Sequence, residues 1–371
     1  MRRPKFELNA LNPFRAARRE TVHPYPAPET LVAEPLAVSL KPWPRLYRDG
    51  DQLLLAWPPA WGQRGARIAI YERRDEESTP LIVVENGDRV ALPLVGSSAQ
   101  QHYVLHVVFH DGTEQWVPAV ERILALDGVL NARDVGGYPA AHGKRVRWRT
   151  IYRTGQLTLL TPAASSALRD ELGVQAIWDL RSADEVSRFP SPVPDGIAVR
   201  NLPIGTGNNR WRRLYDLLRN RDRLDEVMAT AYTIHFVDEH AAAFGHLLNE
   251  LAVTEGAALI HCTAGKDRTG LAVAMLLLLL GVPEPVVVAD YSLSNRWYGP
   301  LVDSLAGELW PLKHLGVSRR QLQPFLTADP ALLRGALRHI DAVYGGLEAY
   351  LRGPAGVQPA TITALRRRLL T

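Results

Sequence analysis

Cys262 and Arg268 are the two residues of this 371-residue chain whose types and spacing most clearly suggest shared chemistry. They lie six positions apart in the stretch HCTAGKDRTG, residues 261–270. A loop between a strand end and a helix N-terminus binds anions, because its backbone N–H groups and the helix dipole point at the ligand. Gly265 and Gly270 suit such a loop, since glycine lets peptide groups approach an anion closely. The pattern predicts a phosphate-binding loop.

The arginine of this loop is expected to bind the phosphate directly. The planar guanidinium of Arg268 can bind two phosphoryl oxygens at once, whereas Lys266 adds charge without that geometry. The residues predicted to bind the substrate phosphate are Thr263, Ala264, Gly265, Lys266, Asp267 and Arg268.

Cys262 is the predicted nucleophile. A positive field at a helix N-terminus favours a thiolate over a thiol, so we expect Cys262 to react as the thiolate. Its attack on phosphorus gives a phosphocysteine that water then hydrolyses, and this chemistry needs neither a metal nor a cofactor. His261 is expected to order the loop by hydrogen bonding to backbone. Thr269 is expected to donate its hydroxyl to the sulfur when the sulfur becomes the leaving group.

The leaving oxygen needs a proton, which a carboxylic acid within hydrogen-bond reach can supply. Asp267 is the first candidate because it lies in the loop itself. Asp179 is the second, since it follows a predicted strand at the sheet edge where α/β sites gather. Asp238 is the third, and the sequence does not decide among them.

Cys262 has three other possible roles. A lone buried cysteine is usually an inert hydrophobic residue, but the flanking residues of this loop favour a reactive thiol. A thiol enzyme of the arsenate reductase type needs further cysteines, and Cys262 is the only one in the chain. A module that binds a phosphorylated ligand without turnover remains the alternative, although intact Cys262 and Arg268 argue against it.

The elements that must position these residues follow a strand, loop and helix order. Residues 257–260 are predicted to form a buried strand leading into the loop, and residues 271–280 a helix that is apolar on all sides. Residues 174–180 form a second predicted buried strand, after a helix over 162–172. Residues 126–371 are therefore predicted to be an α/β domain, with a central, largely parallel sheet flanked by helices.

The preceding part of the chain has a different pattern. Residues 1–36 are rich in Pro, Arg and Ala and are predicted to be a loosely ordered arm. Residues 37–125 contain short strand-like segments separated by turn-forming pairs such as Asp111-Gly112, which predicts a small antiparallel β-sandwich. It is similar to the fibronectin type III or immunoglobulin class, with Trp57 and Tyr103 as core aromatics.

The composition and charge of the chain limit which partners and which location are expected. A net charge of +4 agrees with an anionic partner, but nucleic-acid binding needs a more concentrated positive charge and is not expected. Residues 271–282 form the most apolar run, which is too short to cross a bilayer. The N-terminus lacks the apolar stretch of a secretory signal, so a cytoplasmic location is predicted.

The loop resembles the Cys-x5-Arg signature of protein tyrosine phosphatases, in the form found in bacterial tyrosine/lipid phosphatases, a family that includes a secreted mycobacterial member. Further blocks similar to that family follow in the expected order between residues 127 and 370. They are residues 131–138 (NARDVGGY), 152–155 (YRTG), 179–182 (DLRS) with Glu185, 290–295 (DYSLSN) and 344–351 (YGGLEAYL).

The resemblance implies several roles beyond the loop. It implies dephosphorylation of phosphotyrosine, with phosphoserine, phosphothreonine and phosphoinositides as further substrates, and Lys266 suits a substrate with more than one phosphate. Asp179 and Arg181 are also expected to form an ion pair, and Asp290 and Asn295 to brace helices.

Two further regions of the chain have predicted roles at the surface. The chain departs from the family over residues 205–223, where an Arg-rich run is either a solvated face or a lid that contacts substrate or membrane headgroups. The N-terminal β region is a candidate surface for a protein partner.

Overall fold

The computed structural model describes residues 44–49, 52–72, 79–85, 87–93, 99–205, 218–304 and 317–371. The predicted arm over 1–36 and the Arg-rich run at 210–213 of the proposed lid lie outside these residues. Within the described part of the chain, no helix is both long enough and apolar enough to cross a bilayer.

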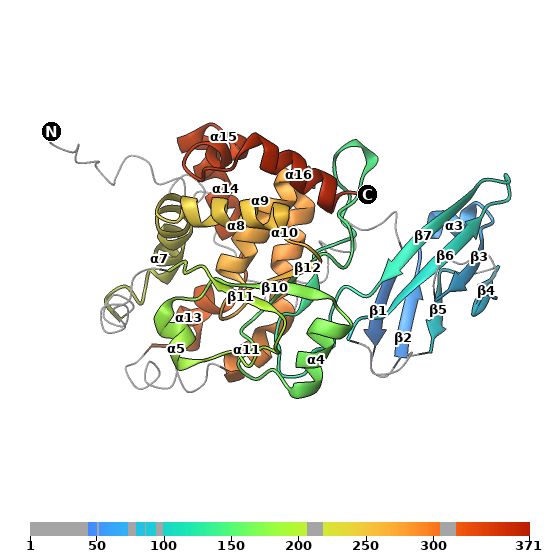
Figure 1. Ribbon diagram of the computed structural model, residues 1–371, viewed down its shortest axis with the longest axis horizontal. Helices are drawn as coiled ribbons and strands as arrows, with labels where there is room; N and C mark the ends of the chain where they lie inside the picture. The colour runs from blue at the N-terminus through green and yellow to red at the C-terminus, as the bar shows by residue number, and fades with distance from the viewer. Residues whose placement is uncertain are drawn as a thin grey trace.

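The N-terminal strands form two antiparallel sheets that share one core (Figure 1). One sheet has the order β1-β2-β5 and the other β4-β3-β6-β7. Side chains of β6 alternate between exposed and buried, as the period of a strand with one buried face requires. Trp57 and Tyr103 lie in the core, as predicted, and Asp111-Gly112 turns the chain between β6 and β7. The strands are β1 (Arg45–Asp49), β2 (Gln52–Ala56), β3 (Arg67–Tyr71), β4 (Ile82–Val84), β5 (Arg89–Leu92), β6 (His102–Val108) and β7 (Glu114–Val120), with the short helix α3 (Pro59–Gln63) after β2.

The following part of the chain builds a five-stranded sheet with the order β11-β10-β12-β9-β8. The pairs β10/β11, β10/β12 and β9/β12 are parallel, and only β8 runs antiparallel to its neighbour. The predicted largely parallel sheet is confirmed. Its strands are β8 (Arg133–Asp134), β9 (Ile151–Thr154), β10 (Val174–Asp179), β11 (Ala198–Asn201) and β12 (Ala257–His261).

The register of this sheet brings the site residues together. His261 pairs with Thr154 on one side and with Asp179 on the other, so the carboxyl ends of β9, β10 and β12 meet at one edge. Side chains of the central strands alternate between two cores. Ile177 and Leu259 pack in the cluster that includes α4, whereas Trp178 and Ile260 pack in the cluster that includes α8 and α9. The sheet is therefore covered by helices on both faces.

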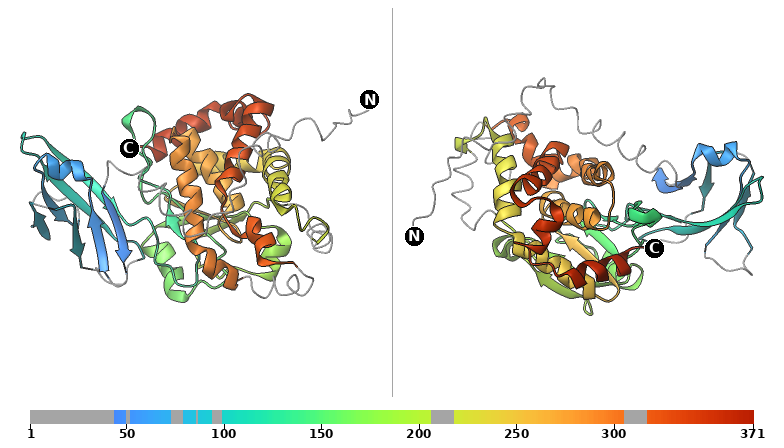
Figure 2. Two further views of the ribbon diagram at one scale, coloured as in Figure 1. Left: turned by 180° about the vertical axis from the view of Figure 1, so that it is seen from behind. Right: turned by 90° about the horizontal axis from the view of Figure 1, so that it is seen from above.

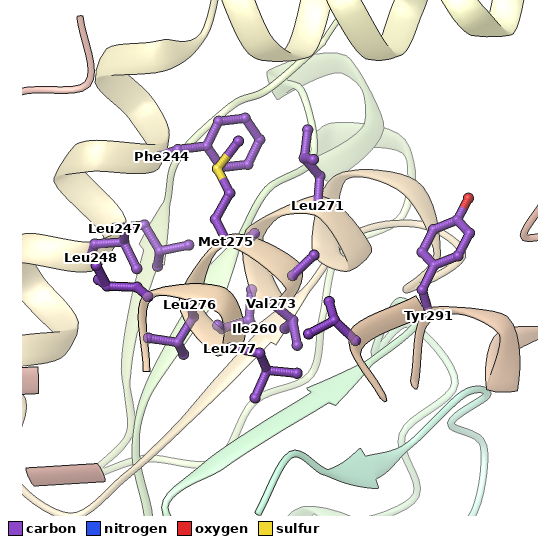
Figure 3. Packing of buried hydrophobic residues seen from close by; sticks show 14 of the residues in the cluster. Phe244, Leu247, Leu248, Ile260, Leu271, Val273, Met275, Leu276, Leu277 and Tyr291 are labelled. Carbon is purple, nitrogen blue, oxygen red and sulfur yellow. The ribbon is translucent and has the colours of Figure 1, made fainter. Parts of the chain in front are cut away.

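Helix α9 (Asp267–Leu279) starts four residues earlier than the helix predicted at 271–280, so it begins inside the phosphate-binding sequence. Nearly all of its side chains are buried, as its apolar sequence predicts. Figure 3 shows Met275 of α9 extending toward the ring of Phe244 on α8. This packing places the N-terminus of α9 at the sheet edge.

The helices on either side of α9 in the sequence are α4 (Pro162–Asp170), α5 (Ala183–Arg188), α7 (Leu224–Thr230), the π-helix η2 (Ala231–Asp238), α8 (Ala241–Val253), α10 (Glu284–Ser292), the 3₁₀ helix η3 (Leu293–Trp297), α11 (Tyr298–Ser304), α13 (Arg319–Leu326), α14 (Pro330–Tyr344), α15 (Leu347–Arg352) and α16 (Pro359–Leu369), with a short 3₁₀ turn η1 (Ala141–Gly143) before β9.

The two parts of the molecule are joined end to end. Figure 2 shows the β-sandwich at one end and the helices around the five-stranded sheet at the other. The chain passes from β7 into the α/β part through residues 121–132, where Ile123 bridges to Arg133. The domain boundaries at residues 36 and 125 stay predictions.

Candidate active site

The loop between β12 and α9 spans residues 262–266 and begins with Cys262, which is 2% exposed. Gly265 has a φ of +64°, a conformation that glycine adopts readily. A Cβ atom there would also lie 2.2 Å from the carbonyl oxygen of Thr154 on β9. Both facts require glycine at this position, so that the loop can pack against the neighbouring strand.

Carbonyl groups of the loop are held on its outer side. The Asn131 side-chain amide donates to the carbonyl oxygens of Ala264 and Gly265, each at 2.9 Å. Arg153 donates to the Gly265 carbonyl at 2.9 Å, and the Thr263 carbonyl accepts a backbone hydrogen bond at 2.9 Å. The C=O and N–H of one trans peptide point in opposite directions. The N–H groups of the same peptides therefore face the inside of the loop, which is the arrangement an anion cradle needs.

A buried charge cluster supports the outer side of the loop. The Asp290 carboxylate binds Arg133 at 3.1 Å and Arg153 at 2.6 Å, and it accepts a hydrogen bond from Tyr138 at 2.9 Å. Burial alone would raise the pKa of Asp290, but the charges of Arg133 and Arg153 outweigh it and hold that pKa below its usual range. Asp290 thus braces the arginine that orients Gly265, a role more specific than the predicted helix brace. The Asn295 side-chain amide joins η3 to Ala328: it donates to the Ala328 carbonyl oxygen and accepts from the Ala328 backbone N–H, in agreement with the predicted brace.

We expect Asp290→Asn to lower the free energy of unfolding by about 3 kcal/mol or more, because it leaves two buried arginines without their counter-charge. Denaturant unfolding measures the change. Asp170→Asn is the matched control, since it breaks an exposed pair with Arg169 and should change the midpoint little. Equal effects of the two substitutions would contradict the prediction.

Arg268 is fixed by Glu185 of α5. Its two terminal nitrogens bind the two Glu185 carboxylate oxygens at 2.7 and 2.8 Å, and Thr263 bonds to both residues. Burial alone would raise the pKa of Glu185 and lower that of Arg268. Their mutual hydrogen bonds and charges outweigh burial, so the pKa of Glu185 is lowered and that of Arg268 is raised. Both side chains stay charged, and the guanidinium is held in one orientation beside Cys262.

Glu185 is itself held by the start of α5. Ser182 caps the helix, and Glu185 three residues later accepts a hydrogen bond from the Ser182 backbone N–H at 2.9 Å. This capping box is visible in the sequence as Ser-x-x-Glu. In the sequence, Glu185 stands next to a block that resembles the family, and its position there predicts no role for it. The capping pattern predicts a helix start, and only the fold shows that the same carboxylate reaches Arg268.

Asp267 is the first residue of α9 and receives two donors on one carboxylate oxygen. Oδ1 accepts a hydrogen bond from Tyr232 at 2.6 Å and lies 3.1 Å from Nζ of Lys266. Among the described residues, Oδ2 has no hydrogen-bond partner. The side chain is partly exposed, so Oδ2 is open to a group bound at the loop.

Tyr232 is oriented by a second tyrosine. Its hydroxyl lies 2.6 Å from that of Tyr291. Burial first, and then the nearby charge of Asp267, raise the pKa of both tyrosines, so both keep their protons. Tyr291 can then donate to Tyr232, which donates to Asp267. Tyr232 lies on the π-helix η2, a rare element that often occurs at functional sites. No sequence pattern had indicated either hydroxyl.

Lys266 is buried and directed away from the loop interior. Its Nζ donates to the carbonyl oxygens of Phe325 and Thr327 at 3.0 and 2.8 Å, in addition to its contact with Asp267. These three contacts use the three hydrogens of an ammonium group. Lys266 therefore anchors the start of α9 to the end of α13. The sequence instead predicted that its ammonium group would face a second phosphate of the substrate.

Asp179 and Arg181 form the predicted ion pair. The guanidinium binds both carboxylate oxygens, the shortest contact being 2.7 Å, and both side chains are buried. Asp238 accepts hydrogen bonds from His339 and Tyr344 of α14, each at 2.8 Å. Of the three candidate acids, Asp267 is the one within the phosphate-binding sequence, at the first residue of α9.

His261 and Thr269 are both fully buried beside the loop. Nδ1 of His261 lies 3.4 Å from the Cys262 carbonyl oxygen, and Nε2 lies 3.6 Å from Asp179. Burial, together with Arg181 and Arg268, lowers the pKa of His261 to about 4 despite the opposing charge of Asp179. The Thr269 hydroxyl has no hydrogen-bond partner among the described residues. That hydroxyl is available to a sulfur at the base of the loop.

The buried His261 predicts a dependence of stability on pH. Below pH 6.5 the unfolded chain binds a proton at this histidine that the folded chain excludes until the pH nears 4. Stability should therefore fall as the pH falls across that window, by about 3 kcal/mol from this residue. In His261→Asn, unfolding measured at pH 7.5 and 4.5 should show a smaller loss than in the wild type. Equal losses in the two proteins would contradict the assignment.

The similarity of this chain to known proteins covers the part that carries the Cys262 loop. A family model described as the tyrosine phosphatase family matches residues 124–371. A Cupriavidus necator protein named as a tyrosine-protein phosphatase is 32% identical over 241 residues, covering 64% of this chain and 86% of the relative. The triple specificity protein phosphatase PtpB of Mycobacterium tuberculosis is 31% identical over 276 residues, covering 66% of this chain and 98% of PtpB.

A tyrosine-protein phosphatase of Nostoc commune is 29% identical over 242 residues, covering 62% of this chain and 78% of the relative. The matched range agrees with the span of family blocks found in the sequence, and the first strands, β1 to β7, precede it. With its Cys262 loop built on β12 and α9, the chain belongs to the tyrosine phosphatase family.

Proposed function

We propose that this phosphatase hydrolyses phosphate monoesters through a phosphocysteine formed on Cys262. One observation carries the proposal: the loop that begins with Cys262 has its carbonyls bonded on the outside, and Arg268 is held beside it by Glu185. Inward N–H groups and a fixed guanidinium neutralise the phosphoryl oxygens, which otherwise repel an anionic nucleophile.

The reaction has two steps. The Cys262 sulfur attacks phosphorus as the bond to the leaving oxygen breaks, and that oxygen takes a proton from Asp267. Asp267, now a carboxylate, accepts a proton from a water that attacks the phosphocysteine, and inorganic phosphate leaves. The Thr269 hydroxyl stabilises the sulfur as the S–P bond breaks. His261, neutral at physiological pH, shapes the loop and takes no proton.

Asp267 is the proposed acid, and its replacement tests the role. We expect Asp267→Asn to lower kcat about 10²-fold or more on phenyl phosphate and far less on p-nitrophenyl phosphate, because p-nitrophenolate leaves without protonation. Steady-state kinetics on both esters measure the difference. Asp179→Asn and Asp238→Asn are the controls, and either one showing this dependence on the leaving group in place of Asp267→Asn would reassign the acid.

Phosphotyrosine in proteins is the proposed substrate, with phosphoserine and phosphothreonine as further substrates. The name of the M. tuberculosis relative, a triple specificity protein phosphatase, supports the broader range. Phosphoinositides have weaker support, because Lys266 is bonded to two carbonyls and Asp267 instead of facing a second phosphate. The cytoplasmic location, peripheral membrane contact and a partner for the β-sandwich stay predictions.

A substrate panel in EDTA tests the proposed function. Purified protein should hydrolyse p-nitrophenyl phosphate at an undiminished rate with EDTA present, and phosphotyrosine peptides should be turned over faster than soluble short-chain phosphoinositides. Faster turnover of phosphoinositides would reverse the substrate assignment. Binding of the phosphate analogue orthovanadate without any turnover would instead support a module that binds phosphorylated ligands.

A further inference from the structure

Two buried tyrosines contact the first turn of α9. Tyr232 of η2 and Tyr291 of α10 have exposed fractions of 0% and 1%, and their hydroxyl oxygens lie 2.6 Å apart. Tyr291 extends from α10 (Figure 3), and its ring packs against α9 at Gly270. A Cβ atom at Gly270 would lie 2.8 Å from Cδ2 of that ring, which is too close for packed carbon atoms. The glycine that ends the HCTAGKDRTG sequence therefore makes room for Tyr291.

The two hydroxyls form a directed chain of hydrogen bonds that ends at Asp267. Tyr232 has one hydroxyl hydrogen, and it donates this hydrogen to Oδ1 of Asp267 at 2.6 Å. The hydroxyl of Tyr291 must then be the donor in its contact with Tyr232. Hydrogen bonds that follow one another in this way strengthen each other. The Tyr232 hydroxyl is therefore held in one direction, toward Asp267.

These contacts distinguish the two oxygens of the Asp267 carboxyl group. Oδ1 accepts the hydrogen of Tyr232 and lies 3.1 Å from Nζ of Lys266. A proton on Oδ1 would meet both of those donors, so the proton of the carboxylic acid occupies Oδ2. Rotation of the carboxyl group would exchange the two oxygens, and it would break the hydrogen bond from Tyr232. Holding Oδ1 in place thus also holds Oδ2 in a fixed orientation, which proton transfer requires.

We propose that Tyr232 is a positioning residue for the general acid, which holds Oδ1 of Asp267 so that Oδ2 carries the proton to the leaving oxygen. This role rests on the proposed function, because it requires Asp267 to be the acid. Tyr232 acts through Asp267 and keeps its own proton. In the second step the same contact leaves Oδ2 as the oxygen that accepts the proton of the attacking water.

The test compares p-nitrophenyl phosphate with phenyl phosphate, as the ratio of kcat/KM on the first ester to kcat/KM on the second. This leaving-group ratio does not depend on how much of a preparation is folded, and kcat/KM includes the step in which the leaving oxygen takes its proton. We expect Tyr232→Phe to raise the ratio about tenfold, because it removes the donor and keeps the acid. Asp267→Asn should raise it about 10²-fold or more. In the Asp267→Asn background, Tyr232→Phe should change the ratio no further.

Tyr350→Phe is the matched control. The Tyr350 hydroxyl is also buried and also bonds to η2, but it donates to the Val237 carbonyl oxygen, at 2.8 Å, rather than to Asp267. This control should keep the wild-type leaving-group ratio. Tyr291→Phe is a second variant, and it should raise the ratio about threefold, because the Tyr232 hydroxyl loses the donor that orients it.

The possible results separate failure of the positioning role from failure of the proposed function. A wild-type ratio in Tyr232→Phe, or an equal rise in Tyr350→Phe, would overturn the positioning role and leave Asp267 as the acid. If Tyr232→Phe does not fold, Tyr291→Phe decides, and a wild-type ratio in that variant would overturn the role. A wild-type ratio in Asp267→Asn would exclude Asp267 as the acid and overturn both proposals.

Discussion

Cys262→Ser will lower the hydrolysis of p-nitrophenyl phosphate by about 10⁴-fold or more. A serine hydroxyl is a weak nucleophile unless a base removes its proton. The nearest imidazole, His261, directs Nδ1 at the Cys262 carbonyl oxygen and Nε2 toward Asp179. The substitution therefore removes the reacting atom without supplying a replacement.

Binding should survive in Cys262→Ser, which separates loss of chemistry from loss of structure. The carbonyl contacts of Asn131 and the pair formed by Arg268 and Glu185 do not involve the sulfur. We expect a phosphotyrosine peptide to bind the variant with an affinity close to its wild-type KM, measured by calorimetry. In rapid-quench mass spectrometry, only the wild type should carry a phosphoryl group on the loop peptide. Turnover by the variant near the wild-type rate would exclude Cys262 as the nucleophile.

Arg268→Lys will lower kcat/KM by about 10³-fold, although the charge is retained. A lysine ammonium cannot bind the two carboxylate oxygens of Glu185 side by side, as the planar Arg268 guanidinium does. Without that fork, Glu185 keeps its negative charge beside the phosphate without a fixed partner. Steady-state kinetics on p-nitrophenyl phosphate measure the loss, and Arg338→Lys on α14 serves as the control.

Glu185→Gln tests whether Glu185 acts through Arg268. Alone it should lower kcat/KM about 10- to 100-fold, because Gln retains the shape of the side chain but loses the charge that fixes Arg268. In the Arg268→Lys background the same change should cost much less, since the interaction it breaks is already lost. Additive losses in this double-mutant cycle would show that Glu185 contributes independently of Arg268.

The contiguous part of the site could be predicted from the sequence. The loop residues from His261 to Thr269 are neighbours in the chain, so their spacing alone specifies a turn between strand and helix with a cysteine at one end and an arginine at the other. Buried strands and an apolar helix could be predicted for a similar reason, because burial imposes hydrophobic runs on a short segment. The predicted helix begins four residues after α9 does, because the polar residues of the first turn of α9 belong to the loop motif.

Tertiary structure alone decided how the loop is held and what its polar residues do. Asn131 reaches Ala264 across 133 positions of sequence, and Glu185 reaches Arg268 across 83. Tyr232, on the π-helix η2, donates to Asp267 across 35 positions of sequence. Lys266, which by sequence could have faced a second phosphate, is instead bonded to two carbonyls at the end of α13. A local sequence pattern predicts the secondary structure of a segment. The partners of a polar side chain depend instead on which distant segments the packed sheet and helices bring beside it.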